Sequence, residues 1–417
     1  MAIHMYVRHL CRTGILVAGC GAVLALSCAG PGLVSERYPD SFYKIPVLMP
    51  ADSLGHNPTF LVYGDTQGSW LVNEKFVKKR NWATWKMALV PFYQLYLLTN
   101  GFVGGIDYLR HNPDYGERQR AMVRDAVYRE ARDGTVDFLL HLGDMAANDG
   151  RIPEHWADFL EENKERHPLL REVPLLPTLG NHDRANDPGY GYPNYRAIFG
   201  YPRFYTMAFP DAMLFVVDSN FILDQYGYIP DAEQDSLFRQ WFVSGDPDAP
   251  AWLERKLLGC DKPFKLVSFH HPPFPFGGHY DDWSNPAYGP DLKGKRARLL
   301  HLLERTGVQV VFSGHEHFYQ HSVWRYDGED PGKKMHFIVS SGGGALLRDG
   351  PDEKHREEHE RKLAAAGFDV ELVDQAEEYH FTRVTITSTR MRISTIAVAE
   401  DPAVNGTIIE EIVIDRP

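Results

Sequence analysis

Short apolar runs recur along the chain, and each gives way to a polar residue within a few positions. Runs of this kind are typical of strands that are buried on both faces of a sheet. They occupy residues 60–63, 138–142, 174–179, 212–218, 264–269 and 308–312. The repeated pattern predicts that buried strands form the centre of the fold.

Longer segments between these runs have the spacing of helices. Residues 112–132 carry an apolar stripe at helical spacing, and Pro113 suits a first helical turn. Residues 155–167 predict a second helix. Residues 379–396 instead alternate apolar positions with Thr, Arg and Ser, which indicates antiparallel strands with one wet face. Together these elements predict an α/β sandwich.

Two segments interrupt this order and are interpreted as insertions. Residues 69–111 are rich in aromatic and basic side chains, with Pro91 and several glycines that break any long amphipathic helix. We expect this segment to pack on the main core, with a lid or a lipid-facing patch as the alternatives. Residues 349–378 predict an exposed, charged helix that serves only solvation.

The first 32 residues have the features of an export segment. Basic side chains precede an apolar stretch that is too short for a confident membrane span. Small residues precede Cys20 and Cys28, as in the lipobox of bacterial lipoproteins, so either cysteine could carry a lipid. The alternatives are an uncleaved anchor and a plain secretory signal. Residues 1–32 therefore predict an exported, lipid-anchored protein of the bacterial cell envelope, with a lead-in at 33–56 and one domain at 57–417.

Charge and cysteine content narrow the possible partners. The chain has 44 basic and 56 acidic side chains and a formal net charge of −12, so we expect no nucleic-acid partner. Cys260 is the only cysteine beyond the first thirty residues, so the domain has no internal disulfide framework.

The residues that follow the apolar runs are ones that bind divalent metals. Because the carboxyl ends of parallel strands share one edge of a sheet, we expect these side chains to meet there. Carboxylates, an amide and imidazoles suit a pair of divalent metals. These residues include Asp65, Asp144, His270, His315 and His317, together with the cluster Gly180-Asn181-His182-Asp183.

Five motifs, taken in order, resemble those of the calcineurin-like metallophosphoesterase superfamily. They are Gly64-Asp65-Thr66-Gln67, Gly143-Asp144, Gly180-Asn181-His182-Asp183, Val267-Ser268-Phe269-His270 and Gly314-His315-Glu316-His317. Flanking stretches such as 269–273 and 341–345 are similar to the purple-acid-phosphatase-like branch. The resemblance implies a metallophosphoesterase-type sandwich of two mixed β-sheets flanked by helices, with a dimetal site at the C-terminal ends of strands. It also implies a phosphoester substrate and two divalent ions, for which Mn, Fe, Zn and Mg are the candidates.

The resemblance also implies how the ligands divide between the metals. Asp144 would bridge both ions. Asn181, His270 and His315 would complete the second metal, and Asp65 and His317 would hold the first. A water between the metals would then attack phosphorus.

The same resemblance assigns His182 as the acid that protonates the leaving group, a role that suits an imidazole with its ordinary pKa of about 6.5. Asp183 would orient His182, or would only cap a turn. His271 is an alternative ligand to His270. Glu316 is expected to face solvent, and His279 to lie on the surface or at the border of the site.

The chain departs from the family pattern at the first metal. Gln67 stands where the superfamily usually has His, and Ala147 stands where purple acid phosphatases have a compensating Tyr. Gln67 could offer its carbonyl oxygen or could only orient a water. An iron–tyrosinate site is therefore not expected, and the first metal could bind weakly or be a harder ion such as Mn²⁺, Mg²⁺ or Ca²⁺.

These features favour a metal-dependent phosphoric-ester hydrolase of the cell envelope. One alternative is a phosphodiesterase or phospholipase that acts on an amphiphilic substrate. The other is a catalytically degenerate, lipid-anchored protein that binds metal.

Overall fold

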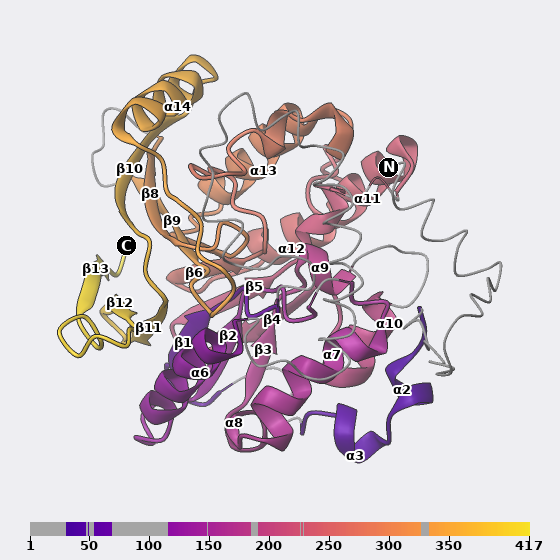
Figure 1. Cartoon of the computed structure of the whole chain (residues 1–417). Helices are drawn as coiled ribbons and strands as arrows, with labels where there is room; N and C mark the ends of the chain where they lie inside the picture. The colour runs from indigo at the N-terminus through magenta and orange to yellow at the C-terminus, as the bar shows by residue number, and fades with distance from the viewer. Residues whose placement is uncertain are drawn as a thin grey trace, which may run out of the picture.

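Two mixed β-sheets pack face to face, and helices cover their outer faces (Figure 1). The computed structural model describes residues 31–46, 49, 54–68, 116–147, 149–184, 191–225, 227, 229–326 and 333–417. The predicted export segment at 1–32, apart from its last two residues, and the whole aromatic insertion at 69–111 lie outside this range. Among the described residues, no helix combines the length and the apolar character needed to cross a membrane.

The six-stranded sheet has the order β13-β12-β11-β1-β2-β3. Its parallel strands are β1 (Thr59–Tyr63), β2 (Phe138–His141) and β3 (Leu175–Pro177). Its antiparallel strands are β11 (His380–Ile386), β12 (Arg390–Ala397) and β13 (Ile408–Asp415).

The seven-stranded sheet has the order β10-β8-β9-β7-β6-β5-β4. Its parallel strands are β5 (Ala212–Val216), β6 (Phe264–Ser268), β7 (Val310–Ser313) and β9 (Lys334–Ser340). Its antiparallel strands are β4 (Tyr205–Ala208), β8 (Tyr319–Arg325) and β10 (Asp369–Ala376). The predicted sandwich of two mixed sheets flanked by helices is thus confirmed.

Helices form the two outer layers. On the six-stranded side lie α2 (Val34–Arg37), α3 (Asp40–Tyr43), α6 (Glu117–Ala131), α7 (Pro153–Leu160), α8 (Leu169–Glu172) and α10 (Gly191–Phe199). On the seven-stranded side lie α11 (Asp231–Trp241), α12 (Trp252–Leu258), α13 (Leu292–Arg305) and α14 (Glu353–Ala365). Shorter turns are α9 (Asn181–Arg184), a π-helical turn (Glu161–Glu165) and 3-10 turns at Ser219–Phe221, Asp282–Ser284 and Pro286–Tyr288.

The core divides into three layers because side chains alternate between the faces of each strand. In β1, Phe60 and Val62 enter the layer between the sheets, whereas Leu61 and Tyr63 pack under the helices of the six-stranded side. Burying each such side chain contributes about 1.5–3 kcal/mol. A shift of one residue in the register of β1 would move its side chains from one layer to the other. The packing of these side chains therefore fixes where β1 ends and where Asp65 lies.

All six predicted apolar runs contain strands, namely β1, β2, β3, β5, β6 and β7. The segment at 349–378 holds the predicted charged helix, α14, but it also holds β10, which the sequence did not predict. β10 pairs with β8 and forms the edge of the seven-stranded sheet. This segment therefore contributes a strand to the sheet in addition to an exposed helix.

Several histidines are buried away from the metal-ligand motifs, and His380 on β11 is one of them. Its Nδ1–H donates to the carbonyl oxygen of Glu378 at 2.8 Å, and burial lowers its pKa to about 4. In the unfolded chain the pKa of His380 returns to about 6.5. Between pH 6.5 and 4, His380 is therefore protonated in the unfolded chain and neutral in the folded chain. The stability that His380 contributes is therefore complete above pH 6.5 and is lost as the pH falls toward 4.

We expect His380→Asn to make the free energy of unfolding less sensitive to acid. Between pH 6.5 and 4 the wild-type chain should lose about 3 kcal/mol more than the variant, because Asn has no charged form. Urea denaturation at a series of pH values measures this difference. The exposed His301 provides the control variant His301→Asn, and an identical pH dependence for His380→Asn and the wild-type chain would contradict the prediction.

Candidate metal centre

The carboxyl ends of strands from both sheets meet at one edge of the sandwich. Across the two sheets, the hydroxyl groups of Thr178 after β3 and Ser268 at the end of β6 lie 2.7 Å apart. Within each sheet the pairing continues beyond the strands, with the Asp65 N–H donating to the Gly143 carbonyl oxygen at 3.0 Å. This edge is where the sequence predicted that the polar motifs would gather.

Four of the predicted ligands adopt left-handed backbone conformations. The φ angles are 60° at Asp65, 58° at Asp144, 78° at His315 and 58° at His317. Residues other than glycine rarely adopt such angles, and those that do cluster at functional sites. Gly180 leaves room for the Asp144 side chain, because a Cβ at position 180 would lie 2.1 Å from Asp144 Oδ1. The local backbone is therefore shaped to turn these side chains toward one another.

Two groups of metal-binding side chains share one carboxylate. The ligand atoms of Asp144, His270 and His315 lie within 4.8 Å of one another, and so do those of Asp65, Asp144 and His317. All five residues are buried. The shared position of Asp144 matches the bridging role that the sequence predicted for it.

At the second metal position, polar atoms crowd around one imidazole nitrogen. The Nδ1–H of His270 donates to the Leu142 carbonyl oxygen at 2.8 Å, which turns Nε2 inward. This Nε2 lies 2.8 Å from Asn181 Oδ1 and 3.3 Å from Asp144 Oδ2. Burial alone would lower the pKa of His270, but the Asp144 charge raises it to about 9. The pocket thus favours a positive charge where these three groups converge, so the residues fit a cation.

The first metal position contains an amide in place of the usual imidazole. The Nδ1–H of His317 donates to the Leu346 carbonyl oxygen at 3.0 Å, so its Nε2 faces the site. Gln67 Nε2 lies 3.1 Å from that nitrogen and 3.4 Å from Asp144 Oδ2. Gln67 Oε1 is buried and has no hydrogen-bond partner among the residues that the structure describes. Because a 180° rotation of the amide exchanges its oxygen and nitrogen, Gln67 can present an oxygen to a metal here.

The carboxylates of the site carry charge in a buried environment. Burial raises the pKa of Asp65 well above its ordinary value, although the His315 backbone N–H donates to both of its oxygens at 2.9 and 3.0 Å. Burial also acts to raise the pKa of Asp144, but the charges of His270 and His182 outweigh it and lower that pKa. Two divalent cations between these carboxylates would stabilise both in the charged form.

His182 lies on the rim of the site, at the start of α9. Its backbone N–H donates to Asp144 Oδ1 at 2.9 Å, and its Nε2 lies 3.9 Å from Asp144 Oδ2. Its side chain is 25% exposed, whereas that of Asp144 is 1% exposed. The imidazole can therefore reach a group that approaches from solvent, as the predicted role requires.

Asp183 makes contacts of another kind. Its carboxylate accepts four backbone N–H groups, those of Asp144, Met145, Ala146 and Gly180, at 2.7 to 2.9 Å. Burial and the Asp144 charge raise its pKa to about 6. These contacts correspond to the capping role that the sequence left open for Asp183.

The two histidines of the 270–271 pair have different surroundings, and only His270 belongs to a group of possible ligands. His271 Nδ1 lies 2.8 Å from the Ser219 hydroxyl group, and His271 belongs to neither ligand group. Glu316 was expected to face solvent, and that expectation is wrong. Its side chain is buried, and burial raises its pKa to about 7.

Three further residues, His279, Asp282 and Gln225, lie beside His315. Asp282 Oδ2 lies 3.1 Å from His315 Nε2 and 3.3 Å from His279 Nδ1, and it accepts an N–H from Gln225 at 3.0 Å. His279, Asp282 and His315 form a third group of possible ligands. Because Asp282 holds Nε2 of His315, the other ring nitrogen is left for the second metal. His279 thus lies at the border of the site, while Asp282 and Gln225 carried no sequence signal.

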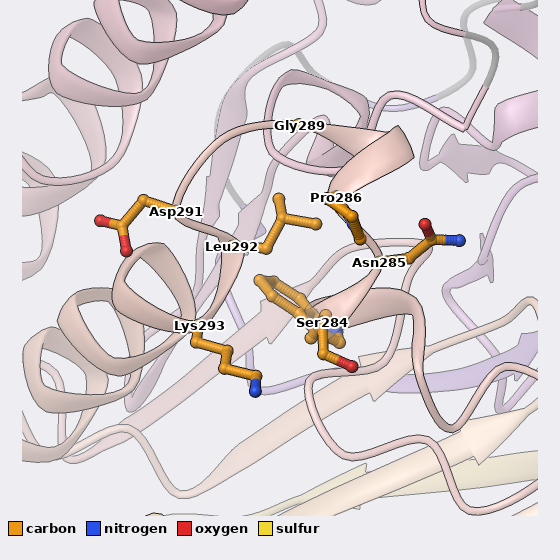
Figure 2. A pocket seen from close by; sticks show the side chains of 8 residues that line it. Ser284, Asn285, Pro286, Gly289, Asp291, Leu292 and Lys293 are labelled. Atoms are coloured by element: carbon orange, nitrogen blue, oxygen red, sulfur yellow. The ribbon is translucent and has the colours of Figure 1, made fainter.

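A separate pocket of about 230 Å³ lies on the segment that follows Asp282. Figure 2 shows the side chains that line it, including Lys293 from the first turn of α13. None of the candidate metal ligands lines this pocket, so it is distinct from the metal centre.

Comparisons with known proteins identify the family of this chain and solved structures of similar fold. A family model described as calcineurin-like phosphoesterase matches residues 58–319. Acid phosphatase type 7 of Mus musculus is 23% identical over 382 residues, covering 85% of this chain and 73% of that protein. The same enzyme of Homo sapiens is 24% identical over 375 residues, with the same two shares.

Among solved structures, the purple acid phosphatase PPD1 from yellow lupin (Lupinus luteus) seeds matches with a TM-score of 0.54 and 13% identity. The match covers 88% of this chain, but the chain spans only 55% of the lupin enzyme's length. At this identity the likeness concerns the fold alone. The family match and the acid phosphatase relatives confirm the resemblance that the five motifs indicated.

Proposed function

The chain belongs to the calcineurin-like phosphoesterase family, and from this premise we propose that it is a metal-dependent phosphoric-ester hydrolase. The observation that carries the proposal is the pair of ligand groups that share Asp144. When bound, two divalent metals supply Lewis-acid stabilisation of the phosphoryl group and an activated water. The residues that would hold them are Asp65, Gln67, Asp144, Asn181, His270, His315 and His317.

The chain's own residues supply orientation and a proton. The backbone N–H of His182 fixes one oxygen of Asp144, and the partly exposed imidazole of His182 faces the approach to the site. In the proposed reaction, His182 protonates the oxygen of the departing alcohol. Asp282 holds the ring of His315, and the Leu142 carbonyl oxygen holds that of His270, so both imidazoles are oriented before substrate arrives.

A second candidate function rests on the first metal position. Ala147 is buried and offers no side-chain donor, so Gln67 alone replaces the ligands expected from related sites. If Gln67 does not hold a metal, the chain would be a degenerate metal-binding protein with one ion. A phosphodiesterase or a phospholipase that acts on an amphiphilic ester remains a further candidate within the enzyme class.

We also propose that the protein is exported to the bacterial cell envelope and is anchored by a lipid on Cys20 or Cys28. The support is the basic, then apolar, then small-residue pattern of the first 32 residues. Metabolic labelling with a fatty acid, followed by Cys20→Ser and Cys28→Ser, tests the proposal. Failure of both single variants to lose the label would overturn it.

The hydrolase proposal is tested by elemental analysis together with a panel of phosphoesters. The full chain should bind two divalent ions and should hydrolyse aryl phosphates in the presence of Mn²⁺ or Zn²⁺. One bound ion without activity would favour the degenerate metal-binding protein. Two bound ions without activity toward any ester would overturn the hydrolase.

We expect His182→Ala to lower kcat by about 10²- to 10⁴-fold for alkyl phosphates, because their alkoxide leaving groups need a proton. The loss should be much smaller for p-nitrophenyl phosphate, whose leaving group departs as a stable anion. Two bound ions should remain, since His182 belongs to neither ligand group. Steady-state kinetics on both esters, with His301→Ala as a surface control, measures the difference, and an equal loss on both esters would contradict the role of acid.

A further inference from the structure

Arg348 is a basic residue beside the first metal position. It follows β9, and its backbone N–H donates to the His317 carbonyl oxygen at 3.2 Å. Two residues earlier, the Leu346 carbonyl oxygen accepts the Nδ1–H of the same histidine. The segment that carries Arg348 is therefore held directly against a proposed metal ligand.

The guanidinium of Arg348 is held by a neutral acceptor. Its Nη1 contacts Nε2 of His279, whose Nδ1 lies 3.3 Å from Asp282 Oδ2. Because a carboxylate accepts the proton of Nδ1, Nε2 is left with a lone pair that accepts an N–H from Arg348. This contact fixes the position of the guanidinium and leaves its charge uncancelled.

Within the described part of the chain, Arg348 forms no ion pair with a carboxylate. Two buried arginines elsewhere in the molecule do form such pairs, since Arg120 pairs with Glu162 at 2.6 Å and Arg151 pairs with Asp149 at 2.5 Å. A guanidinium offers five N–H donors in a planar fork, and one contact with an imidazole occupies few of them. Arg348 therefore keeps both charge and donors for an anion.

The guanidinium of Arg348 lies beside the proposed ligands of the metal site. It contacts the ring of His279, whose centroid lies 3.8 Å from that of the His315 ring. A cation beside residues that would hold two further cations favours an anionic ligand in the site.

We propose that Arg348 binds the terminal phosphoryl oxygen of a phosphate monoester dianion and thereby selects monoesters over diesters. This inference rests on the proposed function and adds a substrate class to it. In a diester, that oxygen carries a second alcohol group, which removes one negative charge and adds bulk at the same position. A charge-assisted, two-pronged contact between guanidinium and phosphoryl oxygens is strong and specific in geometry.

The test compares two esters and one product in the full chain purified with its bound metals. For Arg348→Ala, kcat/KM for p-nitrophenyl phosphate should fall at least about tenfold, because one charge-assisted contact is lost. The kcat/KM for bis(p-nitrophenyl) phosphate should change by less than about twofold. Calorimetric titration with inorganic phosphate should show a similar tenfold loss of affinity for Arg348→Ala. The affinity and the monoester kcat/KM of Arg348→Lys should lie between those of the wild-type chain and Arg348→Ala. Lys293→Ala, at the exposed pocket of Figure 2, is the matched control.

Each other outcome overturns the inference. An equal loss on both esters would make Arg348 a general positioning residue, and an unchanged monoester rate would leave it without a role in recognition. Loss of metal in Arg348→Ala by elemental analysis would mean that it supports His317 instead. If the wild-type chain hydrolyses neither ester with two ions bound, the proposed function fails, and the phosphate titration still decides whether Arg348 binds the anion.

Discussion

Asp144→Asn is expected to lower kcat for phosphoester hydrolysis by at least roughly 10³-fold and to prevent stable binding of the metal pair. Asp144 is the one residue that belongs to both the His270 and the His317 ligand groups. An amide is neutral and has a single acceptor oxygen, so it cannot place negative charge between two cations. The loss should therefore exceed that of any ligand that serves one metal only.

The measurement is elemental analysis joined to steady-state kinetics on the same preparation. Asp261→Asn makes the same chemical change at an exposed position and should leave both quantities unchanged. The Asp144 side chain also accepts the His182 N–H, so the substitution weakens a hydrogen bond of the fold. Circular dichroism therefore checks that the Asp144 variant is folded. A folded Asp144→Asn chain with two ions and near-normal turnover would contradict the bridging role.

The fold was predictable where burial requires apolar runs. The central parallel strands are buried on both faces, so their sequences contain little besides apolar residues. Strand β8 was missed because polar residues, Gln320, His321 and Ser322, occupy three successive buried positions of it. Gln320, for example, accepts the Phe276 N–H and donates to the Phe274 carbonyl oxygen, each at 2.9 Å. These hydrogen bonds join residues that are far apart in the sequence, so the local pattern of apolar and polar residues does not predict them.

The residues that gather at the candidate metal centre were predictable because short motifs at strand ends preserve their order along the chain. Residues that reach the site from irregular loops carried no such signal, and Asp282, Gln225 and Arg348 were missed for that reason. Glu316 was misplaced for a geometric reason. Left-handed backbone at His315 and His317 breaks the alternation of faces, and Glu316 packs so closely on a loop that a Cβ on Gly277 would lie 2.1 Å from its Oε2.

Asp183 connects fold and site, because the loop that presents Asp144 depends on it. The N–H groups of Asp144, Met145 and Ala146 all point to one carboxylate, which lies beside the metal centre and has no exposed surface. Water therefore has little access to replace the carboxylate as an acceptor. Asp183, which the motif suggested as a catalytic residue, would thus act by holding the left-handed turn at Asp144 in place.

We expect Asp183→Ala to lower the free energy of unfolding by about 4 kcal/mol. Four buried N–H groups lose their acceptor, and each such loss costs at least ~1 kcal/mol. Urea denaturation measures the change, and Asp183→Asn, which keeps one acceptor oxygen, should lose roughly half as much. If Asp183 instead oriented His182, the Ala variant would keep its stability and its two ions while kcat fell. A stable but slow variant would therefore restore the catalytic role for Asp183, whereas a destabilised variant that also loses metal would make it the support of the Asp144 loop.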